Sequence, residues 1–398
     1  MIKIDRIKVS NFKNILSADL EMNNFNLIVG PNNSGKSNFL KIFQLLDLII
    51  NGTTEEVKSF FNDAHSSTLG FIKPDYFTQK CEITIELKFT DTTSRTNYNY
   101  SLILEAKPVN KFFNTETSIT NESLTFKSSI KTGKPKSVFS RIGKNVDFGA
   151  EFSKTQILEE VQDHISVVRL LNLITEKNNP YKEAFDLLNY IIKSPVIYFS
   201  NTELNLIKEK KDQYGRIVSY NVLSEIIKLE NKPAFPILKS TLQTILKIDD
   251  IEIIPVTNPS GQETYVVFKQ FNQLKDLSLF SDGSILLISL ITKILSSDHS
   301  IFLLEEPENS LHPKALLELY NFLKSYTEEK QFIIATHSLT LLNKTDYKDV
   351  IVANSNEKGQ SVLSNVSDQK DIIRKLKNGY MDFGDYIFFS DTAEEEIE

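Results

Sequence analysis

The chain has 398 residues, 40% of them hydrophobic and 24% charged, which is typical of a globular protein with a large core and more than one lobe. Its formal net charge of −7 and sequence pI near 5.5 exclude a protein whose whole surface binds nucleic acid. A single cysteine, Cys81, excludes an internal disulfide framework and a cysteine-based zinc site.

No segment has the pattern of a targeting or membrane sequence. Residues 1–6 lack the apolar core of a signal peptide. The longest apolar run, 285–295, contains Lys293 and falls short of the roughly 20 residues that a membrane span needs. We therefore expect a cytoplasmic protein with no membrane partner.

The N-terminal elements are predicted strands that lead into a glycine-rich loop. Apolar patterning predicts strands at 2–9, 16–20 and 26–29, and residues 38–46 have apolar side chains at helical spacing. Strand, glycine loop and helix are the context in which the pattern G-x-x-x-x-G-K-S binds phosphate. The loop is formed by Gly30, Pro31, Asn32, Asn33, Ser34, Gly35, Lys36 and Ser37.

The chemistry of this loop predicts a nucleoside triphosphate as ligand. Gly30 and Gly35 let the backbone wrap so that its N–H groups point at phosphate oxygens, and the helix N-terminus adds partial positive charge. Lys36 is expected to reach the β- and γ-phosphates, and the hydroxyl of Ser37 is expected to coordinate Mg²⁺.

The middle of the chain changes from strand to helix patterning. Short strands from 82 to about 148 predict an antiparallel arm of hairpins. From 152 the period is helical, with a strand at 195–199 and further helix through residue 229 and over 236–247. We expect four parts: an ATPase lobe at 1–150, a compact helical insertion at 151–250, a second ATPase lobe at 251–390 and an acidic tail at 391–398.

One basic stretch in the arm has two interpretations. It holds no Asp or Glu and consists of Lys127, Lys131, Lys134, Lys136, Arg141 and Lys144. A solvated hairpin is favoured, and a contact with nucleic acid stays open as the alternative.

The C-terminal part supplies the acidic and histidine positions of a triphosphatase. From residue 281 strands and helices alternate, which predicts a parallel α/β sheet. An apolar strand at 301–304 leads into Glu305 and Glu306, where the first suits Mg²⁺ held through water and the second suits polarising the attacking water. His337 follows the next buried strand, where it can hydrogen-bond the γ-phosphate, and Ser338 can cap the following helix.

A second phosphate-binding nest is predicted at the start of the apolar helix 285–295. Ser281 and Gly283 stand at the N-terminal end of that helix. One subunit already has a full set of phosphate ligands in its own loop, so this nest is interpreted as serving the nucleotide of another subunit.

In combination these motifs resemble the ABC-type ATPase heads of the RecF/SMC and overcoming-lysogenization-defect (OLD) group. The chain looks most similar to ATPases of bacterial phage-defence systems of the PARIS or Septu type. The resemblance rests on residues 11–14, the phosphate loop with Asn38, 281–283, 305–308 with 311–313, and 335–338.

The resemblance implies an α/β P-loop fold of ABC-ATPase type, with a mixed sheet, the antiparallel arm and the helical insertion. It implies ATP and Mg²⁺ as cofactors and a head-to-head dimer that sandwiches two nucleotides, each between one phosphate loop and the other subunit's Ser281 and Gly283. Glu306 would be the general base, His337 the switch residue, and Asn38 part of the nucleotide site.

Two departures from the family pattern bear on activity. The family usually has Asp at the position of Glu305, which predicts slow hydrolysis. The glutamine of the Q-loop is not placed by the pattern, and Gln79 is one candidate.

OLD-type members continue into a Toprim nuclease domain, whereas this sequence ends soon after 388–391 without such an acidic constellation. We therefore expect an ATPase subunit that scaffolds, senses for or restrains a separately encoded effector, such as a Toprim or HNH nuclease, in anti-phage defence. A RecF-like DNA-repair ATPase that binds DNA directly is the alternative. A transporter subunit is disfavoured, because the signature at 281–284 departs from the transporter pattern.

Overall fold

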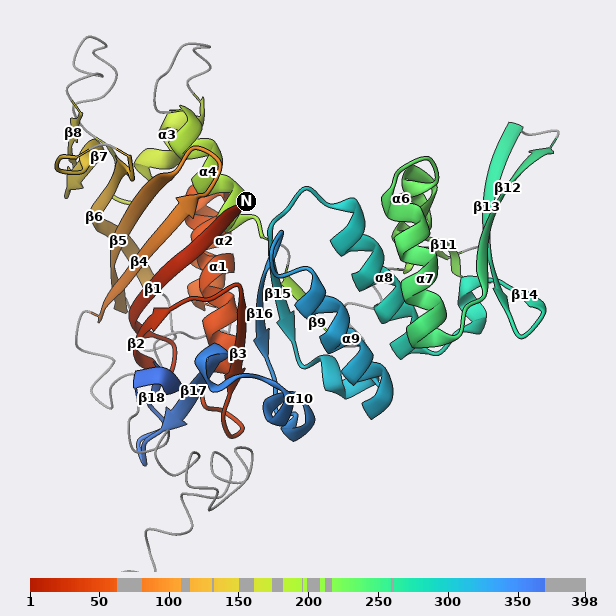
Figure 1. Cartoon of the computed structure of the whole chain (residues 1–398). Helices are drawn as coiled ribbons and strands as arrows, with labels where there is room; N and C mark the ends of the chain where they lie inside the picture. Colours follow the sequence, from red (N-terminus) through yellow and green to blue (C-terminus); the bar gives the residue numbers. More distant parts are fainter. Residues whose placement is uncertain are drawn as a thin grey trace, which may run out of the picture.

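The computed structural model describes residues 1–62, 81–108, 115–130, 132–149, 161–173, 182–194, 196–198, 208–211, 217–258 and 261–368. Within these ranges one mixed sheet of 13 strands runs through the molecule in the order β8-β7-β6-β5-β4-β1-β2-β18-β17-β3-β16-β15-β9. Figure 1 shows this sheet from the antiparallel strands on the left to the parallel strands near the centre.

The parallel part of the sheet carries the predicted motifs. It consists of β3 (Phe25–Val29), β9 (Val196–Tyr198), β15 (Ile301–Glu305), β16 (Gln331–Ala335) and β17 (Val350–Ser355). Every residue of β3 and β16 is buried, as expected for parallel strands covered on both faces. Because β15, β16 and β3 are parallel neighbours, the segments that follow them emerge at one edge of the sheet.

Alternate residues of these strands face two separate cores. Ile28 packs with α1 in the first core, whereas Leu27 and Val29 pack with α8 and α9 in the second. This is the period of two that a strand imposes. The first core lies under α1 (Lys36–Asn51), α2 (Thr54–Asn62), α3 (Val167–Leu173) and α4 (Lys182–Ile192). The second lies under α6 (Asn221–Leu229), α7 (Ala234–Leu246), α8 (Asp282–Ser296), α9 (Pro313–Ser325) and α10 (Leu339–Lys344).

The predicted antiparallel arm is continuous with the ATPase sheet. It consists of β4 (Cys81–Asp91), β5 (Thr96–Pro108), β6 (Thr115–Ser128), β7 (Lys136–Ile142) and β8 (Asn145–Phe148). Strand β1 (Ile2–Phe12) pairs with β4 on one side and with β2 (Ile15–Glu21) on the other. Strand β18 (Ser361–Asn365) then joins β2 to β17. The arm is therefore an extension of one ladder.

The lobe beyond the sheet holds two small sheets of its own. One contains β12 (Asp250–Asn258), β13 (Gly261–Gln270) and β14 (Gln273–Lys275), which confirms the hairpin predicted near Gly261. The other pairs β10 (Lys208–Lys211) with β11 (Ile217–Tyr220). The expectation of helix through residue 229 was wrong before α6, because β11 contains β-branched and aromatic residues that favour a strand.

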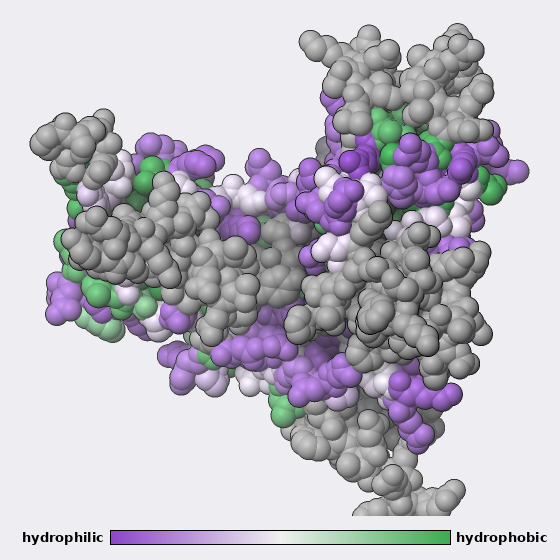
Figure 2. Space-filling view, turned by 180° about the vertical axis from the view of Figure 1, so that it is seen from behind, coloured by the Kyte–Doolittle hydropathy of each residue, from purple (hydrophilic) through white to green (hydrophobic). Residues whose placement is uncertain are grey.

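Short 3-10 helices complete the described elements: η1 (Leu277–Leu279), η2 (Pro307–Ser310), η3 (Tyr347–Asp349) and η4 (Val366–Asp368). At the outer end of the lobe, the hairpin of β13 and β14 exposes Phe271 and Leu274, and green side chains mark this end on the left of Figure 2. None of the described helices is both long and apolar enough to cross a bilayer.

The basic stretch of the arm is not a continuous surface. Arg141 is only 1% exposed, and its guanidinium donates to the carbonyl oxygens of Gly143 (2.6 Å) and Gln162 (3.0 Å). Its charge lies near buried Glu122, whose carboxylate accepts from the Ser166 hydroxyl at 2.6 Å. Burial lowers the pKa of Arg141. Arg141 therefore stabilises the fold and is not part of a basic surface, so the alternative of a nucleic-acid contact through all six residues does not hold for Arg141. Lys131 lies outside the described residues.

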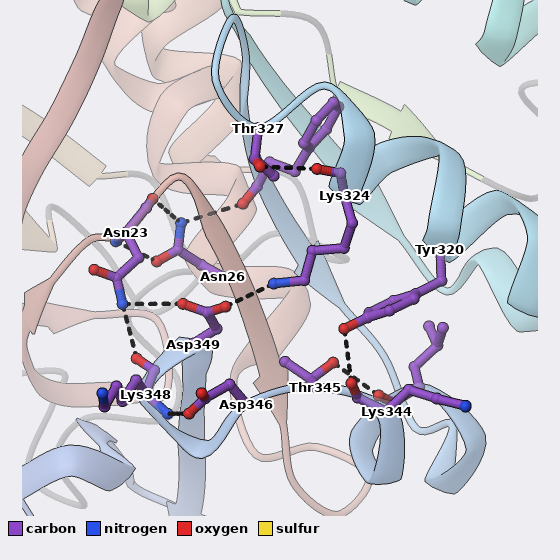
Figure 3. A network of polar contacts seen from close by, with 12 residues as sticks. Asn23, Asn26, Tyr320, Lys324, Thr327, Lys344, Thr345, Asp346, Lys348 and Asp349 are labelled. Carbon is purple, nitrogen blue, oxygen red and sulfur yellow. Dashed lines mark hydrogen bonds and ion pairs between the residues drawn. The ribbon is translucent and has the colours of Figure 1, made fainter.

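A polar network joins three elements at the amino end of β3, opposite the glycine loop (Figure 3). Lys324 of α9 forms an ion pair with Asp349 at 2.7 Å, and its ammonium lies 4.2 Å from the centroid of the Phe25 ring. Asn23 donates to Asp349 Oδ1 at 3.1 Å and to the carbonyl oxygen of Lys348 at 2.8 Å. The network fixes the end of β3 that does not carry the loop.

Candidate functional site

The glycine loop lies between β3 and α1, and two of its positions require glycine. Gly30 has φ +155°, and a Cβ there would lie 2.2 Å from the carbonyl oxygen of Ala353. Gly35 has φ +91°, and a Cβ there would lie 3.1 Å from Oδ1 of Asn14. Pro31, Asn32 and Asn33 are exposed at the mouth of the loop, whereas Ser34 is buried beneath it.

Lys36 is held inside the loop by backbone carbonyl oxygens. Its side chain is buried, and Nζ donates to the carbonyls of Gly30 at 2.9 Å and Pro31 at 2.8 Å. Burial lowers the pKa of Lys36 to about 8, while the charges of the nearby acidic residues Glu306, Glu308 and Glu305 oppose this shift. The present partners of the ammonium are neutral carbonyl oxygens, which bind it more weakly than the charged oxygens of a phosphate would.

Asn14 connects the turn between β1 and β2 to the loop. It is 2% exposed; its Nδ2 donates to the carbonyl of Asn33 at 2.7 Å and to the Ser361 hydroxyl at 3.0 Å, and its Oδ1 accepts from Asn38 at 2.8 Å. No role for Asn14 beyond its place in the family motif was predicted from the sequence. A polar amide between the buried positions Phe12 and Ile15 is the signal that could have indicated one.

The two adjacent glutamates differ in conformation and surroundings. Glu305 ends β15; burial raises the pKa of its carboxyl, and hydrogen bonding by the Ser37 hydroxyl opposes that rise. A hydroxyl beside a carboxylate offers hard oxygen ligands of the kind that Mg²⁺ prefers. The two residues predicted to hold Mg²⁺ are thus brought together, and this oxygen donor set fits that ion.

Glu306 turns out of the ladder into a strained backbone conformation. Its φ and ψ are 49° and 54°, the left-handed region that residues with a side chain rarely adopt. Its N–H donates to the carbonyl oxygen of Ala335 at 2.8 Å, and its carboxylate accepts from the amide of Asn309. Its Oε1 lies 3.8 Å from Nε2 of His337.

His337 follows the neighbouring strand, as predicted, and Ser338 caps α10 by accepting from the Leu341 N–H. Burial and the charge of Lys36 lower the pKa of His337, although Glu306 and Glu308 oppose them. The imidazole is therefore neutral near pH 7, and its contact with Glu306 is polar without being an ion pair. The backbone N–H of His337 donates to Glu308 Oε1 at 2.5 Å.

The predicted signature is separate from the glycine loop within one chain. Ser281 is the N-cap of α8 and accepts from the Ser284 N–H at 3.3 Å, while Gly283 is buried. Helix α8 belongs to the second core and α1 to the first, on opposite sides of the parallel strands, and Figure 1 shows them apart. The structure brings together Lys36, Ser37, Glu305, Glu306 and His337, and does not add Ser281 or Gly283 to them. Gln79 lies outside the described residues.

The solved structures to which the chain is similar include SMC head domains. The SMC head domain from Thermotoga maritima has a TM-score of 0.45 and 13% identity, covering 91% of this chain and 98% of that one. The Smc head domain of Pyrococcus furiosus, with an extended coiled coil and bound to the C-terminal domain of ScpA, has a TM-score of 0.48 and 12% identity, covering 95% and 100%.

One curated relative and one family profile match the sequence. Endonuclease GajA from Bacillus cereus (strain VD045) is 23% identical over 393 residues, which are 95% of this chain and 63% of the relative. The chain thus spans less than two thirds of that protein. The profile of the family described as "AAA domain, putative AbiEii toxin, Type IV TA system" matches residues 25–343, which run from β3 to the last helix of the second core.

The predicted fold class is confirmed: the chain has an ABC-ATPase-like α/β fold with a P-loop, a large mixed sheet and an antiparallel arm. On the family match and on the site that the matched residues contain, this chain belongs to the AAA domain family that bears the AbiEii description.

Proposed function

We propose that this chain binds ATP with Mg²⁺ and hydrolyses it to ADP and phosphate. The observation that carries the proposal is the meeting of Ser37, Glu305, Glu306 and His337 beside the loop that holds Lys36. Ser37 lies in α1, which follows β3. Glu305 ends β15 and Glu306 follows it, while His337 follows β16, the parallel strand between β15 and β3. Membership of an ATPase family supports the same reaction class.

Each side chain has a role in this proposal. The loop N–H groups and Lys36 bind the β- and γ-phosphates, together with Asn38 at the start of α1. Ser37 and Glu305 would hold Mg²⁺, which would supply positive charge to the transferred phosphoryl group. Glu306 orients the attacking water and accepts its proton, and His337 donates to a γ-phosphate oxygen.

The test is the Glu306→Gln variant, assayed for ATP binding and for phosphate release. The amide keeps the shape of the side chain and its contact with Asn309 but cannot accept a proton, so we expect binding to persist and hydrolysis to fall by about 100-fold or more. Glu328→Gln, an exposed change on the surface after α9, is the matched control. Wild-type turnover in Glu306→Gln would contradict the assignment of the base.

We further propose that two chains close around ATP head to head, with Ser281 and Gly283 of one facing the phosphate loop of the other. Helix α8 lies on the opposite side of the sheet from α1, so the signature is separated from the loop of its own chain. This separation supports the head-to-head arrangement. Light scattering should show Glu306→Gln shifting to a larger assembly only with ATP and Mg²⁺. Adding Ser281→Arg should abolish the shift.

The biological role we propose is an ATPase that scaffolds, senses for or restrains a separately encoded nuclease of Toprim or HNH type in cytoplasmic anti-phage defence, as in systems of the PARIS or Septu type. The name of its relative, an endonuclease, supports a link to nucleic-acid cleavage. The purified chain alone should not cleave DNA or RNA; cleavage that depends on ATP and Glu306 would overturn the proposal. The alternative of a DNA-repair ATPase that binds DNA directly loses support from the burial of Arg141.

A further inference from the structure

A third carboxylate, Glu308, contacts the site without belonging to the roles above. It lies on η2, directly after the turn that contains Glu306. One of its oxygens, Oε1, accepts the backbone N–H of His337 at 2.5 Å. The other, Oε2, is buried and has no hydrogen-bond partner among the described residues. Burying a carboxylate oxygen without a partner is costly, so a residue chosen for stability alone would rarely be placed in this way.

The contact lies where the regular pairing of β15 and β16 ends. The last paired residues are Glu305 and Ala335, and the last ladder bond runs from the Glu306 N–H to the carbonyl of Ala335. Beyond this point Glu306 enters its left-handed turn, while the segment after β16 leads through His337 to the cap of α10. The His337 N–H therefore finds its acceptor in the Glu308 side chain instead of in the neighbouring strand.

Together with the last ladder bond, this bond connects the loop of the predicted base to the segment of the predicted switch histidine. Glu308 and Glu306 are held on one short turn, and His337 is fixed to that turn through its backbone. Glu306 Oε1 and His337 Nε2 lie 3.8 Å apart, each on a segment that this bond joins.

We propose that Glu308 is a positioning residue for ATP hydrolysis, which acts through His337 by accepting its backbone N–H and so holding the imidazole opposite Glu306. This inference rests on the proposed ATPase function. It assigns Glu308 no contact with the substrate. The feature that matters is an acceptor oxygen at the right distance, and the negative charge is secondary.

The test is a set of variants at Glu308 combined with His337→Ala. Glu308→Ala removes the acceptor and should lower kcat by about 10- to 100-fold with KM nearly unchanged, the size expected for a misplaced catalytic side chain. Glu308→Gln keeps an amide oxygen at the same reach and should stay within about threefold of wild type. Glu308→Asp keeps the charge but withdraws the oxygen by one methylene, so it should behave like Glu308→Ala.

The decisive comparison is the double-mutant cycle. If Glu308 acts through His337, Glu308→Ala should change kcat by less than about twofold in the His337→Ala background, because the group it positions is already gone. Equal losses in both backgrounds, or a Glu308→Gln as impaired as Glu308→Ala, would overturn the inference. Should Glu308→Ala unfold, Glu308→Asp takes its place in the cycle.

The proposed function fails in a different way. If Glu306→Gln and His337→Ala both hydrolyse ATP at the wild-type rate, the proposed ATPase site is wrong, whatever the Glu308 variants show. If both are impaired but the cycle is additive, only the role of Glu308 is refuted. Thermal unfolding of each variant confirms that kcat is compared between folded proteins.

Discussion

Glu306 Oε1 lies 3.8 Å from His337 Nε2, so the predicted base and the predicted switch residue face each other across the ends of two neighbouring strands. Glu306 reaches this position from a left-handed backbone conformation with φ 49°. A strained residue at the point where two predicted catalytic side chains meet is typical of a functional site.

The strain at Glu306 should be measurable by comparing glycine and alanine at this position. Glycine adopts positive φ without steric cost, so Glu306→Gly should be more stable than Glu306→Ala by about 1 kcal/mol, and both should be inactive. Urea unfolding of the two variants gives the comparison, and both lose the same carboxylate. Equal unfolding free energies would show that the conformation is not strained.

The contact between Ser37 and Glu305 predicts a change in the requirement for Mg²⁺. Replacing Glu305 by Gln removes the charge that would hold the ion through water, so the Mg²⁺ concentration for half-maximal hydrolysis should rise by about tenfold. The measurement is phosphate release against Mg²⁺ at saturating ATP, with Glu328→Gln as the control. An unchanged Mg²⁺ curve would remove Glu305 from the metal site.

The lowered pKa of Lys36 predicts that ATP affinity depends on pH. With the pKa at about 8 in the free protein, the ammonium is present below that pH and is lost as the pH rises through it. Phosphate oxygens need the charged form, so affinity should be highest below about pH 8 and should fall above it, with uptake of a proton on binding. Calorimetric titration between about pH 7 and about pH 9.5 measures both quantities.

The control for this prediction is Lys36→Arg, because a guanidinium stays charged throughout the range. Its ATP affinity should be weaker than that of the wild type but flat above pH 8. A wild-type affinity that is equally flat would show that Lys36 keeps its proton in the free protein.

Asn14 should support the phosphate loop through its own hydrogen bonds. Asn14→Ala leaves the carbonyl of Asn33 and the amide of Asn38 without their partner, which should lower the free energy of unfolding by about 1 to 3 kcal/mol. ATP affinity should weaken as well, while Asn23→Ala, at the other end of β3, should affect stability but leave affinity unchanged. If Asn23→Ala weakened ATP affinity and Asn14→Ala did not, Asn14 would not be the residue that supports the phosphate loop.

The sequence predicted the parts of the site that are local in the chain. A strand, a glycine loop and a helix are contiguous, so Lys36 and Ser37 could be placed from residues 26–46 alone. Regular alternation of strands and helices then placed Glu305 and His337 beside one another, because parallel neighbours end at one edge.

Features set by long-range packing could not be predicted in this way. The hydrogen bond from His337 to Glu308 depends on where the pairing of β15 and β16 ends, and no local pattern encodes that point. Arg141 looks like its lysine neighbours in the sequence, yet it is buried because Gln162 and Ile165 fold back over it. The left-handed conformation at Glu306 could not be predicted, because no glycine stands at this position to indicate a positive φ.

The pairing of β1 with β4 has a mechanical consequence. Paired residues follow this junction from Ile2 to Ser10 of β1, with one irregularity between Ile4 and Arg6, so the arm and the nucleotide-binding strands are parts of one hydrogen-bonded sheet. A hairpin attached by a linker could swing while the loop stayed still, whereas β7 and β8 are hydrogen-bonded into the sheet. We therefore expect a displacement at the tip of the arm to be passed through the sheet to the strand beside Asn14, and from there to the loop that holds Lys36.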